Sequence, residues 1–308
     1  MTSSLPEGLS FVIPCFNSGR YLQEAVDSLR AQPHDFPYEV LVVDDGSDDS
    51  GTLRTISACA GLPELRVHRL GRRCGHHVAR NAGVGSARFR YVMQLDADDR
   101  LATDPVLLAE GSYPDRSVRI LRSDPTVAFV HTMSRMFGDF DGLTISSYPC
   151  TEELILHKHH VPTSIVHRHE DAVAGGLYDP QVVKWGDWAF AVNLLAGRFR
   201  RGAGNMIACI PGPLHEYRVH STGQRVSGAH VSESAMTLRV VERNLDLFRH
   251  RLGRGDSAAA IARDVLAMKP SRLEDLIRMA DFDLRQALTV ARQRRFSLPS
   301  PYEALGIP

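Results

Sequence analysis

Carboxylate side chains occur at three places in this sequence where they could do chemistry. Residues 94–99, QLDADD, place three carboxylates at the end of an apolar run, where a divalent cation could neutralise them and meet a phosphate. A second acidic pair, Asp44-Asp45, ends the apolar run 39–43 and is followed by Gly-Ser. The third feature is Asp187 in the segment WGDW, which could serve as a base. Together the three features predict a metal-dependent site for a nucleotide sugar.

The composition is that of a globular chain without a strong overall charge. The chain has 308 residues, of which 43% are hydrophobic, enough for one large domain with an appendage or for two modest domains. Its 36 basic and 36 acidic residues cancel, so no global field draws the protein toward nucleic acid or anionic lipid. We therefore expect no nucleic-acid partner and a ligand that is held by local contacts.

Cysteine content and hydropathy predict a cytoplasmic protein. The five cysteines include no Cys-x-x-Cys pair, and their odd number favours reduced thiols. Residues 1–10 lack a basic region that leads into an apolar one, and the chain has no apolar stretch of about 18 residues. We expect a soluble chain with no membrane span.

The elements that must position the carboxylates alternate between short strands and helices in the first hundred residues. The predicted strands are 9–14, 40–43, 65–69 and 91–95, and the predicted helices are 21–32 and 77–86. Such βαβ units form a parallel sheet, and ligands of open α/β sheets bind at the carboxyl ends of the strands. Asp44-Asp45 and residues 96–99 both follow such ends, so we expect them to lie on the ligand-binding edge.

After residue 125 the pattern predicts a mixed, largely parallel sheet flanked by helices. The predicted elements are a strand at 127–136, a turn at 138–142, a short strand at 164–167 and a buried helix at 187–196. Asp187 lies at the N-terminal end of that helix. It is therefore expected to reach the site from the second half of the chain.

The C-terminal part changes composition and has helical periodicity. Its predicted helical segments are 232–250, 257–268 and 272–293. We expect two units, an α/β domain at 1–228 and a helical extension at 229–308. Within the first unit, a nucleotide-binding half at about 9–100 and an acceptor-side half at about 125–228 are expected. The extension is a candidate surface for a homo-oligomer.

Seven short motifs occur in a fixed order along most of the chain. They are FVIPCFN (11–17), VVDDGSD (42–48), ARNAG (79–83), LDADD (95–99), AGGLYD (174–179), GDW (186–188) and YRVH (217–220). Over roughly residues 9–225 the series resembles family 2 glycosyltransferases with the GT-A fold, of the soluble bacterial type. The resemblance implies an inverting, metal-dependent transfer of a hexosyl or N-acetylhexosaminyl group. The expected donor is a nucleotide-diphosphate sugar, with a UDP-sugar preferred, and the expected acceptor is a hydroxyl group.

Within this resemblance, the first two motifs are expected to bind the nucleotide. Asp45 is expected to accept the N3–H of a uracil-type base, because a carboxylate accepts that bond without rearrangement. Asp44 either supports Asp45 or caps the next helix, and the whole acidic turn could instead be only a helix cap. Pro14, Phe16 and Asn17 are expected to contribute to the same site, although Asn17 could also act only as a cap.

The acidic motif at 95–99 is expected to hold the diphosphate through a metal ion. Asp96 and Asp98 leave an extended segment on one face, because strand side chains alternate. The resemblance implies that Asp96, with Ala97, contacts the ribose or a metal-bound water and that Asp98 ligates Mg²⁺ or Mn²⁺. A solvated acidic loop is the alternative. His220 is a second candidate metal ligand or else a surface histidine, and Arg80 pairs with Asp96, with the diphosphate, or in a structural ion pair.

Asp187 is the candidate general base. It would take a proton from the acceptor hydroxyl while the nucleoside diphosphate leaves with its charge carried by the metal. The alternative is an N-cap for the following helix. The family usually has Glu-Asp at this place and this chain has Gly-Asp, so a helper carboxylate is missing and Gly186 opens space. Glu216 or Asp179 could instead have taken over the role.

Two other functions remain alternatives. A sugar nucleotidyltransferase would carry a Gly-rich, basic phosphate loop after its first strand, and residues 14–19 lack one. A non-catalytic protein would bind UDP with metal but hydrolyse no UDP-sugar. The histidine-rich segment 157–169 is interpreted as acceptor-side surface, with a zinc site as the alternative. The sequence identifies neither the sugar nor the acceptor.

Overall fold

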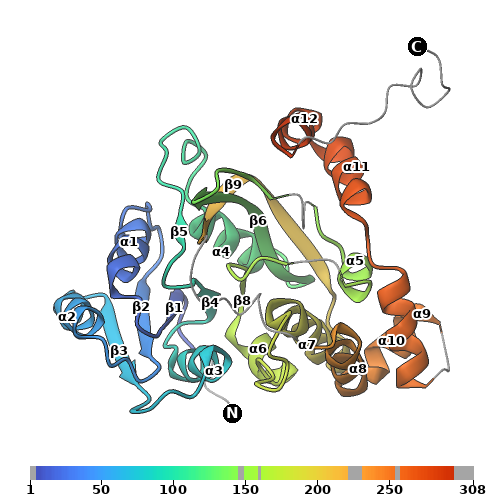
Figure 1. Cartoon of the computed structure of the whole chain (residues 1–308), viewed down its shortest axis with the longest axis horizontal. Helices are drawn as coiled ribbons and strands as arrows, with labels where there is room; N and C mark the ends of the chain where they lie inside the picture. Colours follow the sequence, from blue (N-terminus) through green and yellow to red (C-terminus); the bar gives the residue numbers. More distant parts are fainter. Residues whose placement is uncertain (1–4, 145–148, 159–160, 221–230, 254–256, 295–308) are drawn as a thin grey trace.

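The structure, a computed structural model, describes residues 5–144, 149–158, 161–220, 231–253 and 257–294. Figure 1 shows a central sheet flanked by helices, with a group of helices at the C-terminal end. Within the described residues the sheet has nine strands, in the order β3-β2-β1-β4-β8-β6-β9-β5 with β7 paired to β6. In the same part of the chain, no helix is long and apolar enough to span a bilayer.

The first half of the chain forms the parallel side of the sheet. Its elements are β1 (Leu9–Cys15), α1 (Gly19–Arg30), β2 (Tyr38–Asp44), α2 (Ser50–Cys59), β3 (Leu65–Arg69), α3 (His76–Ser86) and β4 (Tyr91–Gln94). Strands β3, β2, β1 and β4 pair in parallel. Because they run the same way, the residues after β2 and β4 meet at one edge. The predicted strands and helices of this half are found within a few residues, and α2 is an additional helix.

The second half of the chain extends the sheet in mixed orientation. Its elements are β5 (Arg100–Leu101), α4 (Tyr113–Ser123), β6 (Val127–Gly138), β7 (Gly142–Leu143), α5 (Glu152–Leu156), β8 (Val166–Arg168), α6 (His169–Gly175), α7 (Gly186–Arg200) and β9 (Met206–Val219). Strand β8 is antiparallel to β4 and β6, whereas β6 and β9 are parallel. The predicted mixed α/β architecture is confirmed.

Alternating side chains of the strands pack into two apolar layers, one on each face of the sheet. Phe11 and Ile13 of β1 pack in the layer that contains the apolar residues of α1 and α4. Val12, between them in sequence, packs on the other face with α3 and α7. This period of two is what a strand covered on both faces requires. Helix α7 is buried nearly all round, which explains its almost continuous apolar sequence.

The C-terminal helices divide into two groups. They are α8 (Glu233–Arg243), α9 (Leu245–Leu252), α10 (Ala258–Ala267), α11 (Arg272–Phe282) and α12 (Leu284–Gln293). Each of the predicted segments 232–250 and 272–293 is therefore two helices. Helices α8 to α10 pack into the layer that contains α7, whereas α11 and α12 pack on β6 and β7 and stand apart in Figure 1. The expected boundary at 228/229 lies outside the described residues and stays a prediction. Among the described residues, α8 to α10 share an apolar core with α7.

Candidate active site

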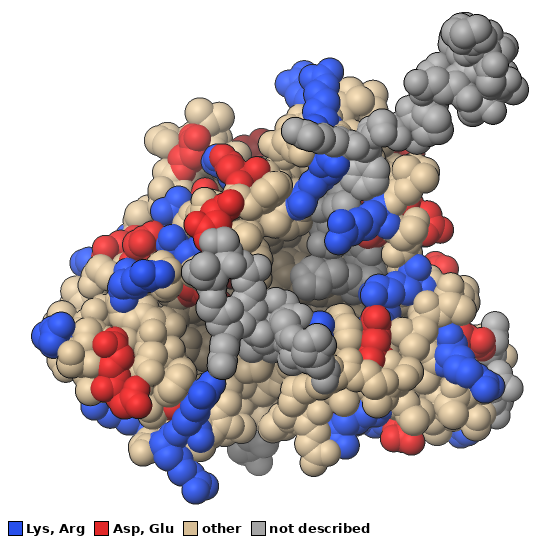
Figure 2. Space-filling view, viewed as in Figure 1, with Lys and Arg blue, Asp and Glu red and all other residues tan. Residues whose placement is uncertain are grey.

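A cavity of about 690 Å³ lies at the carboxyl edge of the sheet and is lined by both halves of the chain. The first half contributes the loops after β1, β2 and β4 and the start of α3. The second half contributes β6, β9 and the start of α7. Figure 2 shows acidic and basic side chains interspersed over one face of the molecule, as the cancelling charges predict. The cavity, rather than an overall field, is therefore the candidate for recognising a ligand.

Asp45 lies at the cavity and is fixed by the loop before α3. Its carboxylate accepts hydrogen bonds from the backbone N–H groups of Cys74, at 2.6 Å, and Gly75, at 2.9 Å. Each carboxylate oxygen has a further lone pair, so a base N–H can still be accepted. Gly46 permits this arrangement, because its φ is +75° and a Cβ there would lie 2.4 Å from the Arg72 backbone. The two backbone bonds therefore fix the Asp45 carboxylate at the edge of the cavity.

Asp44 and Asn17 hold loops and lie outside the cavity lining. The Asp44 carboxylate accepts a bond from the Ser47 N–H at 2.9 Å, which closes the acidic turn. The helix that follows is capped by Asp49 instead. Asn17, at φ +50°, donates to the Asp48 carboxylate at 2.7 Å and accepts two backbone N–H groups of the same loop. The structure thus gives both residues a supporting position behind the site.

Pro14, Phe16 and Ala97 line the cavity, as expected from the sequence. The Arg73 guanidinium lies 4.3 Å from the centre of the Phe16 ring, and Arg73 also lines the cavity. The sequence analysis missed Arg73. It also missed His76, which lines the cavity from the first turn of α3. Burial, and then the neighbouring Arg80 charge, lower the pKa of His76.

Arg80 joins the two halves of the site. Its guanidinium donates to Asp96 at 2.6 Å and to Asp187 at 3.3 Å, and its side chain is buried. Burial opposes the positive charge, but the two carboxylates outweigh burial and raise the pKa of Arg80. Burial likewise opposes ionisation of Asp96, yet the Arg80 charge holds the Asp96 pKa below its usual value. The three groups form a fixed ionic bridge between β4 and α7.

Asp98 and His220 present a pair of potential metal ligands to the cavity. The His220 Nε2 and an Asp98 carboxylate oxygen lie 2.8 Å apart, and both residues line the cavity. Carboxylate oxygen and imidazole nitrogen suit Mn²⁺ and are compatible with Mg²⁺, with waters or phosphate oxygens completing the shell. Among the described residues, no group of three or more His, Cys, Asp or Glu residues could hold a metal alone. The pair therefore fits a metal that is shared with a diphosphate.

Asp99 turns away from this pair toward β9. Its carboxylate accepts the Arg218 backbone N–H at 2.8 Å and lies 3.3 Å from the His215 Nε2. Burial raises the pKa of Asp99 to about 6. The His215 Nδ1 lies 2.8 Å from the Ser134 hydroxyl of β6. Asp99 thus ties the acidic motif to the strand that carries the YRVH motif.

Asp187 is in the first turn of α7, and the N-cap interpretation is wrong. The helix begins at Gly186, and the N-cap position belongs to Trp185, whose side chain makes no capping bond. The Asp187 side chain instead reaches Arg80 and the cavity. Glu216 is paired with Arg100, and Asp179 with Arg239 at 2.7 Å. Neither lines the cavity, so the geometry leaves Asp187 as the candidate base.

The space next to Gly186 is filled, which corrects the expectation that this glycine opens the site. A Cβ at position 186 would lie 2.1 Å from the Nε2 atom of His77. The His77 ring stacks on Tyr178 with ring centres 5.2 Å apart, and burial lowers its pKa to about 3. A neutral imidazole therefore occupies the space that a side chain before Asp187 would need.

The interpretation of segment 157–169 as acceptor-side surface is wrong for two of its histidines. His157 and His167 are buried, the second in β8 with its Nδ1 3.1 Å from the Arg168 carbonyl oxygen. His169 begins α6 and contacts the Val84 carbonyl at 3.0 Å. His159 and His160 lie outside the described residues. The described histidines of this segment thus serve the core and its edges.

Comparisons with known proteins find a matching family model and similar curated proteins. Residues 10–110 match the family model described as Glycosyl transferase family 2. The succinoglycan biosynthesis protein ExoO of Rhizobium meliloti is 39% identical over 98 residues, 31% of this chain and 27% of that protein. An uncharacterised protein of Mycobacterium tuberculosis is 29% identical over 232 residues, 70% of this chain and 60% of that protein. The chain thus spans 27% and 60% of the lengths of these two relatives.

Solved structures share the fold over nearly the whole chain. TarS of S. aureus, residues 1–349 in complex with UDP-GlcNAc, has a TM-score of 0.57 at 19% identity and covers 97% of this chain and 77% of its own. The mannosyltransferase PcManGT of Pyrobaculum calidifontis, in complex with GDP-Man and Mn²⁺, has a TM-score of 0.51 at 18% identity. It covers 97% of this chain and 83% of its own.

Sequence and fold point to one class: residues 10–110 form a glycosyltransferase family 2 region, and the chain has the GT-A fold of its structural neighbours.

Proposed function

We propose that this protein is an inverting glycosyltransferase that moves a sugar from a UDP-sugar to an acceptor hydroxyl with the help of Mg²⁺ or Mn²⁺. The observation that carries the proposal is the bridge from Asp96 through Arg80 to Asp187, which joins a donor side and an acceptor side within one cavity. The group that we propose is transferred is a hexosyl or N-acetylhexosaminyl group. TarS, whose fold this chain shares, is known in complex with UDP-GlcNAc.

The donor side would hold the nucleotide between the first and second motifs. Asp45 would accept the base N3–H, and the aromatic ring of Phe16 with the Arg73 guanidinium stacked on it offers a flat surface beside it. Asp96 faces the same cavity and is ionised under the influence of Arg80, so it can accept ribose hydroxyls.

Asp98 and His220 would hold the divalent cation. When bound, such a cation neutralises the charge that develops on the leaving diphosphate. Arg218 supports the ligand segment, because its guanidinium donates to the Asp98 carbonyl at 2.8 Å and to Glu24 at 2.6 Å. The acidic motif is therefore clamped from its backbone while the Asp98 carboxylate faces the cavity.

Asp187 would act as the general base on the acceptor side. The acceptor oxygen attacks the anomeric carbon, its proton passes to the Asp187 carboxylate, and the bond to the nucleoside diphosphate breaks on the opposite face. Arg80 holds one oxygen of Asp187 at 3.3 Å, which orients the carboxylate toward the cavity. A second carboxylate is not required for this orientation.

The proposed location of the protein is the cytoplasm, and the proposed assembly is a homo-oligomer. All five cysteines are free thiols, as suits the reducing cytoplasm. Apolar side chains are exposed on the C-terminal helices, among them Leu273, Ile277, Leu284 and Leu288. We place a contact between copies of the chain on this face.

The proposed function is tested by separating binding from chemistry. Asp187→Asn should bind UDP with Mn²⁺ nearly as the wild type does, while turnover falls by roughly 10² to 10⁴, the usual share of general base catalysis. Asp98→Asn should lose the metal-dependent part of UDP binding. Calorimetric titration with Mn²⁺ or with EDTA, together with turnover of UDP-sugars, measures both effects.

Asp141→Asn is the matched control, because this exposed carboxylate is also paired with an arginine, Arg135 at 2.9 Å, and lies outside the cavity. It should leave binding and turnover unchanged. Equal UDP affinity with Mn²⁺ and with EDTA would remove the metal assignment. UDP binding without hydrolysis of any UDP-sugar would favour a non-catalytic binding protein.

A further inference from the structure

Trp185 has a strained backbone at the acceptor side of the cavity. It lines the cavity two positions before Asp187, and its φ is +61°. A left-handed conformation of a bulky residue is unfavourable and persists only where the surroundings enforce it. Such strain is concentrated at ligand clamps and active sites. Contacts around Trp185 must therefore enforce this backbone conformation, and we expect the conformation to serve the site.

A buried ammonium group lies against the Trp185 ring. The Lys158 Nζ is 4.2 Å from the centre of the Trp185 ring and 5.2 Å from that of Trp188. Only 1% of the Lys158 side chain is exposed, so its charge has lost most of its water. A desolvated cation interacts more strongly with an aromatic face than an exposed one does. Lys158 thus fixes the indole ring.

Helix α8 in turn fixes Lys158. The Lys158 Nζ lies 2.6 Å from a Glu233 carboxylate oxygen and donates to the Thr237 hydroxyl at 2.9 Å. Glu233 is also paired with Lys269 at 2.8 Å, just beyond α10. Loss of Glu233 would leave the buried Lys158 ammonium without its carboxylate, which is costly, so α8 holds Lys158 against the Trp185 ring. The C-terminal helices therefore reach the cavity through Lys158.

The part of the cavity lining that comes from the second half of the chain is rich in hydroxyl and apolar groups. Besides the two tryptophans, it includes Thr132, Ser134, Met136, Thr144, Pro162 and Thr163. Between positions 132 and 188, the charged residues of the lining are Lys184 and Asp187. An aromatic ring with neighbouring hydroxyl groups matches a sugar ring, which has apolar C–H faces and a polar edge. The Lys184 Nζ lies 5.1 Å from the centre of the Trp185 ring, and its charge is opposite to that of Asp187, so this part of the lining has no net charge and suits an uncharged ring.

We propose that Trp185 is the platform on which an uncharged pyranose ring of the acceptor stacks, and that Lys158, held by Glu233, positions this platform. The proposal rests on the proposed function and adds the class of acceptor, a neutral glycan end rather than a phosphate-bearing one. Trp185 and Asp187 line the same cavity, so a ring stacked on Trp185 would lie in the space that the base faces. The C-terminal helices would then contribute to acceptor recognition without contacting the acceptor.

The two tryptophans of the chain make the platform observable. In a Trp188→Phe background, Trp185 is the remaining source of indole fluorescence. The protein with UDP and Mn²⁺ is titrated with methyl glycosides and β-linked disaccharides of glucose, galactose, mannose and N-acetylglucosamine, and separately with glycerol 3-phosphate. We expect a saturable change of fluorescence with at least one neutral glycoside and none with glycerol 3-phosphate.

Calorimetry on chains that keep Trp188 provides the second measurement. Trp185→Ala should weaken the responding glycoside by about tenfold or more, and Trp185→Phe by less, because a phenyl ring still stacks. Lys158→Met should weaken the glycoside, whereas Lys269→Met should not, since Lys269 binds the same carboxylate without touching the ring. UDP affinity should stay within about twofold in all four variants, because the donor side is unchanged.

Three results would overturn the platform. They are the absence of a saturable glycoside response in a protein that binds UDP, a response to glycerol 3-phosphate alone, and unchanged glycoside affinity in Trp185→Ala. Failure to bind UDP with Mn²⁺ would instead contradict the proposed function itself. The two failures are therefore distinguishable in one set of titrations.

Discussion

His77 and Gly186 share a space at the start of α7 that admits one side chain. The His77 ring is confined by Tyr178 on one side and by His76, with ring centres 4.0 Å apart, on another. Within the described residues, its Nε2 atom has no hydrogen-bond partner and points at Gly186. In this chain, which has Gly-Asp where the family usually has Glu-Asp, the His77 imidazole therefore occupies the space beside position 186. Asp187 keeps its orientation through Arg80.

The contact between His77 and Gly186 predicts that substitutions at these two positions have strongly non-additive effects on stability. Gly186→Ala should destabilise the wild-type chain by about 1–3 kcal/mol, because its Cβ meets a confined ring. In a His77→Ala background the same change should be neutral or slightly stabilising, since alanine is the better helix former. Urea unfolding of the four proteins in a double-mutant cycle measures the coupling. A coupling energy near zero would mean that the ring moves aside freely.

The sequence singled out residues that the structure brings to one cavity, but it did not predict all of their contacts. Asp45, Asp98, Asp187 and His220 each lie in a short motif, and the structure brings all four to one cavity. The contact of Lys158 with Trp185 was not predictable. Its two residues lie far apart in the sequence and carry no motif, so only packing reveals the pair.

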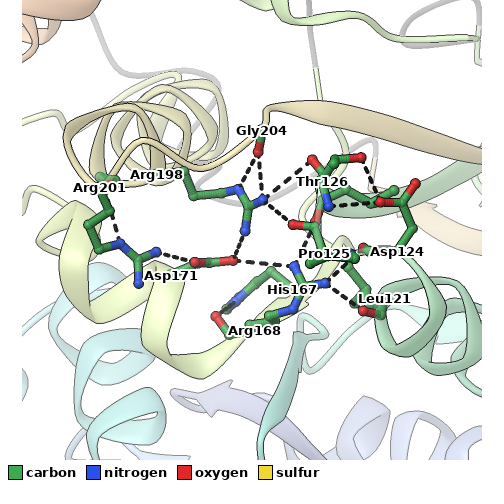
Figure 3. A network of polar contacts seen from close by, with 12 residues as sticks. Leu121, Asp124, Pro125, Thr126, His167, Arg168, Asp171, Arg198, Arg201 and Gly204 are labelled. Carbon is green, nitrogen blue, oxygen red and sulfur yellow. Dashed lines mark hydrogen bonds and ion pairs between the residues drawn. The ribbon is translucent and has the colours of Figure 1, made fainter.

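At the scale of elements, a buried ionic network anchors the far end of α7. Figure 3 shows Asp171 of α6 between Arg198 and Arg201 of α7 and its C-cap, with Arg168 of β8 close by. The Asp171 carboxylate is 2.5 Å from Arg198 and 3.6 Å from Arg168. Arg198 also donates to the carbonyl oxygens of the loops before β6 and β9. The helix that carries Asp187 is thus fixed at both ends.

Asp171→Asn should therefore destabilise the protein by about 3–5 kcal/mol, because it leaves buried guanidinium charges without their carboxylate. Asp246→Asn is the matched control. Asp246 is paired with Arg200 at 2.7 Å on the surface, so its loss should cost less than about 1 kcal/mol. Chemical denaturation of both variants gives the comparison. Similar costs for the two would show that the network is solvated and does not anchor α7.

The parallel half of the sheet was predictable because apolar residues recur along its strands and helices at the spacings typical of each. Strand β9 was not predicted, since its sequence contains Pro211, Gly212 and Pro213, residues that argue against a strand. The structure accommodates them at a shift in register with β6 between Thr132 and Ser134. Helices α4 and α6 were also missed. The irregular strand matters, because its later residues carry the YRVH motif to the cavity.

For the molecule as a whole, buried neutral histidines make stability depend on pH. Burial lowers the pKa of His77 to about 3 and that of His167 to about 4, from an ordinary value of 6.5. Above pH 6.5 both residues are neutral in the folded and the unfolded chain. Between pH 6.5 and 4, the unfolded chain binds protons that the folded chain does not, so stability falls as the pH falls.

His167 tests this dependence at the centre of the sheet, between β4 and β6. Its ring packs edge-on against Phe190 with ring centres 5.2 Å apart, so His167→Phe keeps an aromatic ring there. The wild type should lose more free energy of unfolding between pH 6.5 and 4.5 than this variant does, by roughly 2 kcal/mol, since each pKa unit is worth about 1.4 kcal/mol. His250→Phe, at an exposed position of α9, should behave as the wild type. The comparison uses the pH slope of denaturant unfolding, so a constant cost of either substitution cancels. An equal slope in His167→Phe and the wild type would mean that the folded chain protonates His167 as readily as the unfolded chain does.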